Sequence, residues 1–192
     1  MSYFPAESEI PSAAARLFGR RLGQFSWALL DWSQQPYFTL ITTFIFAPYF
    51  VTTFIGDPLR GQELWGYTQA AVGLIIALAS PVFGAISDRM GRRKPWIAAF
   101  GFFYLFGNLA LWVAAPGAVH LVLMIIAAVV VAGIAAEFIT VFSNAMLPDL
   151  ATAAELGRLS GFGWALGYVG GLLSLIIIIS VPVLKDTSGQ WV

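Results

Sequence analysis

The sequence predicts an all-α membrane protein of about five transmembrane helices, and three observations support this prediction. Apolar residues make up 59% of the 192 residues and charged residues only 10%, and the mean hydropathy is +0.81. A soluble domain is roughly 45–50% apolar and 25% charged, so lipid must solvate much of this chain. The apolar residues fall into five segments, each with at least the about 20 residues that cross a bilayer. The basic residues gather on one side of these segments.

Charged residues separate the expected elements. The polar residues 1–23 are expected to form a cytoplasmic N-terminal segment. The first span is longer than a bilayer needs, and Pro36 removes a backbone donor within it, so we expect a kinked or locally opened helix there. The last residues read as an outer loop heading into another helix, so we expect the architecture to continue beyond this sequence. The predicted spans are 24–54, 64–87, 96–115, 119–142 and 159–184, followed by the start of the loop at 185–192.

The basic residues predict the orientation of these spans. Eight of the ten Lys and Arg residues fall on one side and only Arg60 and Lys185 on the other. Because cytoplasmic loops carry the excess of Lys and Arg, the N-terminus is expected in the cytoplasm of a multi-pass protein of the inner or plasma membrane. Tryptophans at the expected helix ends, Trp27, Trp65, Trp96, Trp112 and Trp164, are expected to lie at the membrane interfaces.

A short basic loop between the second and third spans carries the most specific pattern. Gly84 precedes Asp88 by four residues, and Gly91 is followed by a basic run. A small residue allows close helix approach, and a glycine supplies the turn. The positive-inside rule accounts for the charges of this loop but not for its two glycines and its acid together. We therefore expect a conformational latch formed by Gly84, Asp88, Arg89, Gly91, Arg92 and Arg93.

This loop resembles the signature between the second and third helices of the major facilitator superfamily. The resemblance implies the N-terminal bundle of that fold, a further helical bundle that is missing from this sequence, and transport of a small solute by alternating access. The stretches 25–32, 47–50, 144–149 and 157–168 resemble the branch that contains the autophagy-related vacuolar amino-acid effluxers and their bacterial relatives. For that branch the resemblance implies a transporter, with export of amino acids as the function in fungi, whereas the substrate of the bacterial members stays open.

Two acids within the expected spans are candidate site residues, because a carboxylate is costly in a membrane. Helical spacing groups Asp31 with Gln35, and Glu137 with Asn144. The superfamily resemblance implies that the first and fourth helices line the pathway, so both acids are candidates for binding a substrate amine or for proton coupling. In the structural alternative, Asp31 satisfies backbone groups freed by Pro36 and Glu137 pairs with an arginine. Asn108 is a weaker candidate.

The fifth span carries Gly163, Gly167 and Gly171 four residues apart, which predicts a face for close helix packing. One His and no Cys leave no material for a metal cluster or a cysteine nucleophile, and we expect no cofactor, no metal and no enzymatic activity. Equal numbers of basic and acidic residues give no indication of a nucleic-acid partner. The expected partners are the lipid bilayer, a small polar solute and protons as a candidate coupling ion.

Two other functions stay open from sequence. A sugar or other solute carried by a symporter of the same superfamily would use the amides and tryptophans rather than the acids. A non-transporting membrane sensor or assembly protein would need an output domain or a partner surface, and the loops show neither.

Overall fold

A computed structural model describes residues 13–91 and 93–180 of the chain. Every regular element in these ranges is helical, and no strand occurs among them. Five helical segments are long and apolar enough to cross a membrane, which confirms the predicted fold class. These segments are Leu17–Phe54, Pro58–Ile86, Lys94–Val113, Val119–Ala145 and Leu156–Ser180.

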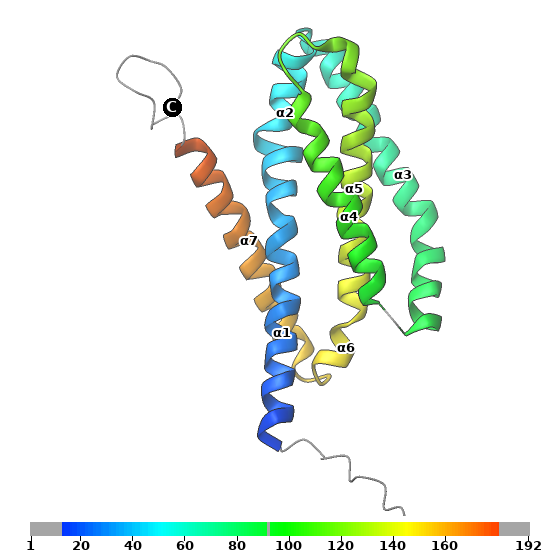
Figure 1. The fold of residues 1–192 in the computed structure, drawn as a ribbon, viewed down its shortest axis with the longest axis vertical. Coiled ribbons are helices and arrows are strands. Elements are labelled where there is room, and N and C mark those ends of the chain that lie inside the picture. Colours follow the sequence, from blue (N-terminus) through cyan, green and yellow to red (C-terminus); the bar gives the residue numbers. More distant parts are fainter. Residues whose placement is uncertain (1–12, 92, 181–192) are drawn as a thin grey trace, which may run out of the picture.

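The helices of the five segments follow one another with short connections (Figure 1). In chain order they are α1 (Ala13–Pro36), η1 (Tyr37–Phe44), α2 (Phe46–Tyr49), η2 (Phe50–Phe54), α3 (Pro58–Met90), α4 (Lys94–Ala110), η3 (Leu111–Val113), η4 (Val119–Leu121), α5 (Val122–Ala145), α6 (Leu147–Leu150) and α7 (Leu156–Ser180). The expected loop at 185–192 and the end of the last predicted span lie outside the described residues.

The second spanning helix begins earlier than the predicted residue 64, because it carries a strong start signal. Asp57 caps α3, and its carboxylate accepts hydrogen bonds from the backbone N–H groups of Leu59 (3.0 Å) and Arg60 (3.3 Å). Pro58 occupies the first turn, where a missing N–H costs nothing. The Asp57-Pro58 pair therefore sets the start of α3. The prediction placed the start later because it took the charged residues Arg60 and Glu63 as the boundary.

The first segment widens after its proline instead of ending there. Beyond Pro36 the backbone continues as the π-helix η1, and a second π-helical turn, η2, follows α2. Pro36 cannot donate a hydrogen bond within the helix, and a π-helical turn is one way for the chain to absorb that loss. The hydroxyls of Thr42 and Thr43 each donate to the carbonyl of Phe38 at 2.8 Å, which satisfies a backbone acceptor in this wider stretch.

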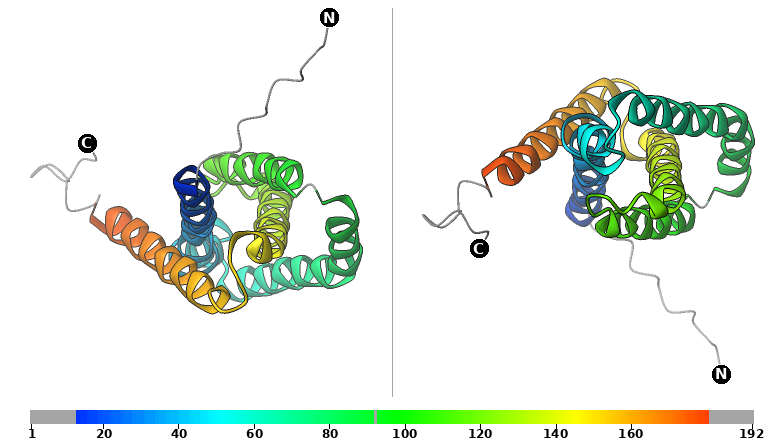
Figure 2. Two further views of the ribbon diagram at one scale, coloured as in Figure 1. Left: turned by 90° about the horizontal axis from the view of Figure 1, so that it is seen from below. Right: turned by 90° about the horizontal axis from the view of Figure 1, so that it is seen from above.

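The bundle has two main packing groups. α5 packs against α4 and α3, whereas α1 packs chiefly along α7. Figures 1 and 2 show α7 extending from one side of the bundle and α3 from the other. We call the end at which α1, α4 and α7 begin the basic end, because it carries Arg20, Arg93, Lys94 and Arg158.

Aromatic side chains fill the interior at both ends. Towards the far end, a buried cluster includes Phe46, Phe50, Phe54, Trp65 and Ile125. Towards the basic end, Phe83 of α3 packs edge-on or tilted against rings of α4 and α5, with its centroid 4.5 Å from that of Phe138. These large, mostly apolar rings fill the space between the packed helices.

Two of the tryptophans that were expected at the interfaces lie inside the bundle instead. Trp27 is 5% exposed and Trp65 is 8% exposed. The indole N–H of Trp27 donates to the carbonyl of Ser143 at 2.8 Å, which allows the polar edge of the ring to be buried. Trp112 and Trp164 are 92% and 57% exposed. Trp27 and Trp65 therefore contact neighbouring helices, whereas Trp112 and Trp164 are open to the surroundings.

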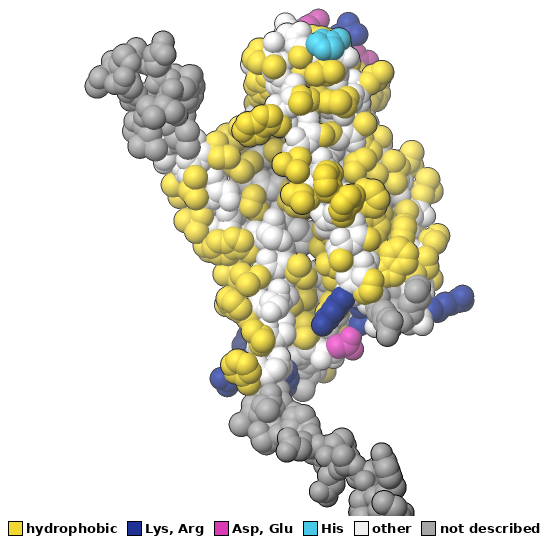
Figure 3. Space-filling view, in the orientation of Figure 1, with side chains coloured by type: hydrophobic (Ala, Val, Ile, Leu, Met, Phe, Trp, Pro, Cys, Tyr) yellow, Lys and Arg dark blue, Asp and Glu magenta, His cyan; other side chains and the backbone are white. Residues whose placement is uncertain are grey.

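The outer surface of the helices is largely apolar, as a lipid environment requires. Figure 3 shows hydrophobic side chains over the length of the helices, with charged side chains gathered at the two ends. Many of the large apolar side chains of α3, α4 and α7 are exposed, among them Leu78, Phe106 and Ile177. An apolar surface of this extent is unfavourable in water and favourable in a bilayer.

Candidate functional site

A cleft between α1, α5 and α7 contains four of the five predicted site residues. Its volume is about 320 Å³. Asp31 and Gln35 reach it from α1, and Glu137 and Asn144 reach it from α5. The remaining lining residues are Trp27, Phe38, Thr140, Ser143, Trp164 and Tyr168. The structure thus brings both intramembrane acids to one cavity with four aromatic side chains.

Neither acid of the cleft has a cationic partner among the residues that the structure describes. Asp31 and Glu137 are both half-buried, and neither forms a salt bridge with a residue that the structure describes. No Lys or Arg is among the residues that line the cleft. Two carboxylates without a counter-charge attract a positively charged group into this space.

The close packing of α7 on α1 forms one wall of the cleft. A Cβ atom at Gly163 would lie 2.5 Å from the ring of Trp27, and one at Gly167 would overlap the carboxylate of Asp31. A Cβ atom at Gly171 would meet the hydroxyl of Thr39. The three glycines therefore bring the two helix backbones together and place Asp31 at the contact.

The opposite wall is held by hydrogen bonds that join α1 and the adjoining η1 to α5. The hydroxyl of Thr140 donates to the side-chain carbonyl of buried Gln34 at 3.2 Å. The hydroxyl of Tyr37 donates to the backbone carbonyl of Val129 at 3.1 Å. These bonds and the Trp27–Ser143 bond set the rotation of α1 about its axis, and so they decide which of its side chains point into the cleft.

Asn108, the fifth predicted candidate, lies away from the cleft. Its side-chain amide donates to the carbonyl of Tyr104 one turn earlier on α4, at 2.8 Å. The hydroxyl of Tyr104 in turn lies 3.4 Å from the carbonyl of Ser33. The Asn108 side chain therefore hydrogen-bonds to the backbone of its own helix, and Asn108 is not among the residues that line the cleft.

The loop between α3 and α4 is only partly described. Gly91 ends α3 in the left-handed conformation, with φ of +61°. Arg89 is exposed, and no atom of the described residues lies within 4 Å of a Cβ built on Gly84. The side chain of Asp88 and the whole of Arg92 lie outside the described part of the structure.

Arg93, one of the residues predicted to form a latch, has an ion-pair partner in the structure. Its guanidinium forms an ion pair with Asp149 of α6 at 2.5 Å. The Arg93 side chain is 19% exposed, whereas that of Asp149 is 69% exposed. This contact joins the start of α4 to the short helix after α5 at the basic end of the bundle.

Several residues of the site were not predicted to belong to it. Trp27 and Trp164 were assigned to the membrane interfaces, and Tyr168 and Ser143 had no assigned role. Helical spacing could have indicated them, since Trp27 precedes Asp31 by one turn on α1 and Trp164 precedes Tyr168 by one turn on α7. Asp149 carried no signal of its own, because its partner is distant in the sequence.

With this geometry in place, the comparison with known proteins is specific. Residues 10–181 match the Major Facilitator Superfamily, and the chain belongs to this family of membrane transporters. It is similar to the uncharacterized MFS-type transporter YxiO of Bacillus subtilis (strain 168), with 29% identity over 166 residues. That match covers 84% of this chain and 38% of the relative, so the chain spans well under half the length of the relative. No solved structure matches the chain.

Proposed function

We propose that this chain provides the substrate-binding half of a secondary transporter that moves an amino acid or a similar small amine by alternating access. The observation that carries the proposal is the cleft that Asp31 and Glu137 share, where no described residue supplies a counter-charge to either acid. A second helical bundle, the plasma or inner membrane and a cytoplasmic N-terminus are parts of the same proposal. Family membership and the length of the relative support it.

The chemistry of the cleft favours an amine over other polar groups. An ammonium group would pair with one or both carboxylates, and the faces of Trp27, Trp164 and Tyr168 would add cation–π attraction. Because no Lys or Arg lines the cleft among the described residues, it offers the carboxylate of an amino acid no counter-charge. We therefore assign the amine end of the substrate to this cleft.

Proton coupling is the second role proposed for the two acids. When the cleft is empty of substrate, a half-buried carboxylate in a membrane is costly to keep charged, and protonation removes that cost. Binding of an ammonium group would favour release of that proton. If a proton and the substrate exchange at the same carboxylate, transport of the substrate in one direction is coupled to transport of a proton in the other.

The sugar alternative rests on one observation. Gln35 and Asn144 also line the cleft, next to two tryptophans, and amides with aromatic faces can bind a neutral polyol. A sugar would leave both carboxylates unpaired in the bound state. The amine is therefore the better partner.

The decisive experiment is a thermal-shift binding assay on the purified protein with L-lysine, L-leucine, agmatine and D-glucose. We expect the amines to raise the melting temperature and glucose to have no effect. Glu137→Gln and Asp31→Asn should each weaken amine binding at least about tenfold, because a charge-assisted hydrogen bond is lost.

Glu63→Gln is the matched control, since Glu63 is an exposed acid on α3 outside the cleft. It should bind amines like the parent protein. If glucose stabilises the protein and both acid variants retain that effect, the substrate is a sugar. If the amines stabilise the parent and both acid variants equally, the cleft is not the binding site. Uptake into proteoliposomes by the protein that carries the proposed second helical bundle should follow the same order.

A further inference from the structure

A second cavity lies at the basic end, outside the amine cleft, between residues 20–25 of α1 and the start of α7. Its volume is about 460 Å³. It is lined by Arg20, Arg21, Gln24, Phe25, Glu155, Arg158, Leu159 and Phe162. None of these residues lines the amine cleft, and the proposed function uses none of them.

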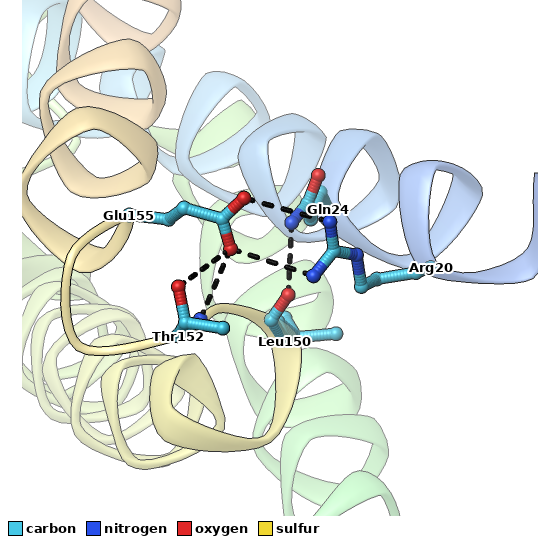
Figure 4. A network of polar contacts seen from close by, with 5 residues as sticks. All are labelled: Arg20, Gln24, Leu150, Thr152 and Glu155. Atoms are coloured by element: carbon cyan, nitrogen blue, oxygen red, sulfur yellow. Dashed lines mark hydrogen bonds and ion pairs between the residues drawn. The ribbon is translucent and has the colours of Figure 1, made fainter. Parts of the chain in front are cut away.

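One of the three arginines already has a partner (Figure 4). The guanidinium of Arg20 reaches both carboxylate oxygens of Glu155, at 3.4 and 3.5 Å. Glu155 also accepts hydrogen bonds from the backbone N–H and the hydroxyl of Thr152, at 3.2 and 2.9 Å. Gln24 donates to the carbonyl of Leu150 at 2.8 Å. This network ties the connection between α6 and α7 to α1.

The cavity therefore keeps an excess of positive charge. Its lining holds three arginines and one acid, and Glu155 is engaged by Arg20 and Thr152. Arg21 and Arg158 form no salt bridge with any described residue, and both side chains are exposed. Two guanidinium groups that open onto one cavity form a site for an anion with several oxygen atoms, such as a phosphate group.

The position of the cavity indicates where that phosphate comes from. Arg21 and Arg158 lie in the opening turns of two helices that are long and apolar enough to span a membrane. Further along the same helices, Phe25 and Phe162 line the cavity and are 50% and 49% exposed. A phospholipid at this place would set its head group against the arginines and its acyl chains against the rings. Basic pockets between helix ends at the membrane surface suit anionic lipids in this way.

We propose that the cavity between α1 and α7 is a binding site for an anionic phospholipid, whose phosphate is held by Arg21 and Arg158. The lipid would bridge the first and last described helices of the bundle next to the Arg20–Glu155 contact. It would therefore stabilise the packing of α7 on α1 that also forms one wall of the amine cleft.

The test is native mass spectrometry of the whole chain in detergent, titrated with phosphatidylglycerol, with phosphatidylcholine and with glycerol 3-phosphate. The parent protein should retain phosphatidylglycerol in preference to phosphatidylcholine. The double variant Arg21→Gln/Arg158→Gln should bind phosphatidylglycerol about 25-fold more weakly, at about fivefold for each arginine near the head group. Arg21→Lys/Arg158→Lys keeps the charge and should lose much less.

Arg60→Gln, which removes an exposed arginine at the other end of the bundle, is the matched control for the single variant Arg158→Gln. It should bind phosphatidylglycerol like the parent.

Arg20 is left unchanged in every variant so that its contact with Glu155 persists, and circular dichroism verifies the fold. Should the double variant not fold, each single variant must still show its fivefold loss. Equal phosphatidylglycerol binding by the parent and the Gln variants overturns the proposal. Glycerol 3-phosphate binding as tightly as the lipid also overturns it, in favour of a soluble phosphate.

Discussion

The carboxylate of Asp31 on α1 lies directly against Gly167 on α7, with no room between them for a methyl group. This contact links the packing of the two helices to the position of an acid in the amine cleft. A change on α7 that looks purely structural therefore acts on the proposed binding site as well.

Gly167→Ala is expected to destabilise the protein by about 1–3 kcal/mol, because the new methyl group overpacks a close helix contact. It should also displace the Asp31 carboxylate and weaken amine binding. The measurement is thermal and denaturant unfolding in detergent, followed by the thermal-shift binding assay. Gly161→Ala on the same helix is the control, because a Cβ atom there meets no other atom within 4 Å. Equal stability of the two variants would show that α7 does not pack on α1 as described.

Gly91→Ala is expected to cost about 1–2 kcal/mol, since Gly91 adopts a φ of +61° that strains any residue with a side chain. Gly91→Asn should cost less, because Asn tolerates the left-handed region better than Ala does. Gly84→Ala lies within α3 in open space and should be neutral or stabilising. Unfolding free energies measured side by side give the order. An Ala variant at 91 as stable as the parent would contradict the described end of α3.

The Arg93–Asp149 pair is expected to contribute no more than about 1 kcal/mol of coupling, because the Asp149 side chain is largely exposed to solvent. The measurement is a double-mutant cycle with Arg93→Gln, Asp149→Asn and the double variant. Arg93→Gln alone should cost more than Asp149→Asn, since the stem of Arg93 is mostly buried and loses packing. A coupling energy well above this bound would indicate that the pair is shielded from water in the assembled protein.

Glu155 gives a prediction for the dependence of stability on pH. Hydrogen bonds from Thr152 and the nearby guanidinium of Arg20 lower the pKa of the Glu155 carboxyl from its ordinary value of 4.5. A lowered pKa in the folded state means that this stabilisation is present above the unfolded pKa. It is lost as the pH falls through the folded pKa. Glu155→Gln should therefore melt at a lower temperature than the parent at neutral pH.

The difference between Glu155→Gln and the parent should shrink as the pH falls below 4.5, the ordinary value for this carboxyl. Melting curves of both proteins over a pH series measure it. Glu63→Gln, which changes an exposed acid outside this network, should show no such trend. A difference that grows as the solution becomes acidic would have the wrong sign and would refute the described network.

Local patterns were sufficient for the architecture and for part of the site. Hydrophobic length depends only on neighbouring residues, so the five spans could be counted without a structure. Helical spacing also placed Asp31 with Gln35, and Glu137 with Asn144, because a helix repeats every 3.6 residues. The start of α3 was missed although Asp57 and Pro58 formed a local signal for it.

What the sequence by itself determined is the number of helices, their apolar surface and the residues that share one face of each helix. Only the tertiary structure decided how these faces are turned towards one another. It brought Asp31 and Glu137 to one cleft, left Asn108 outside it, and buried Trp27 against Gly163. The physical reason is that helix rotation is set by contacts between distant segments, such as the Trp27–Ser143 bond, which no local pattern contains.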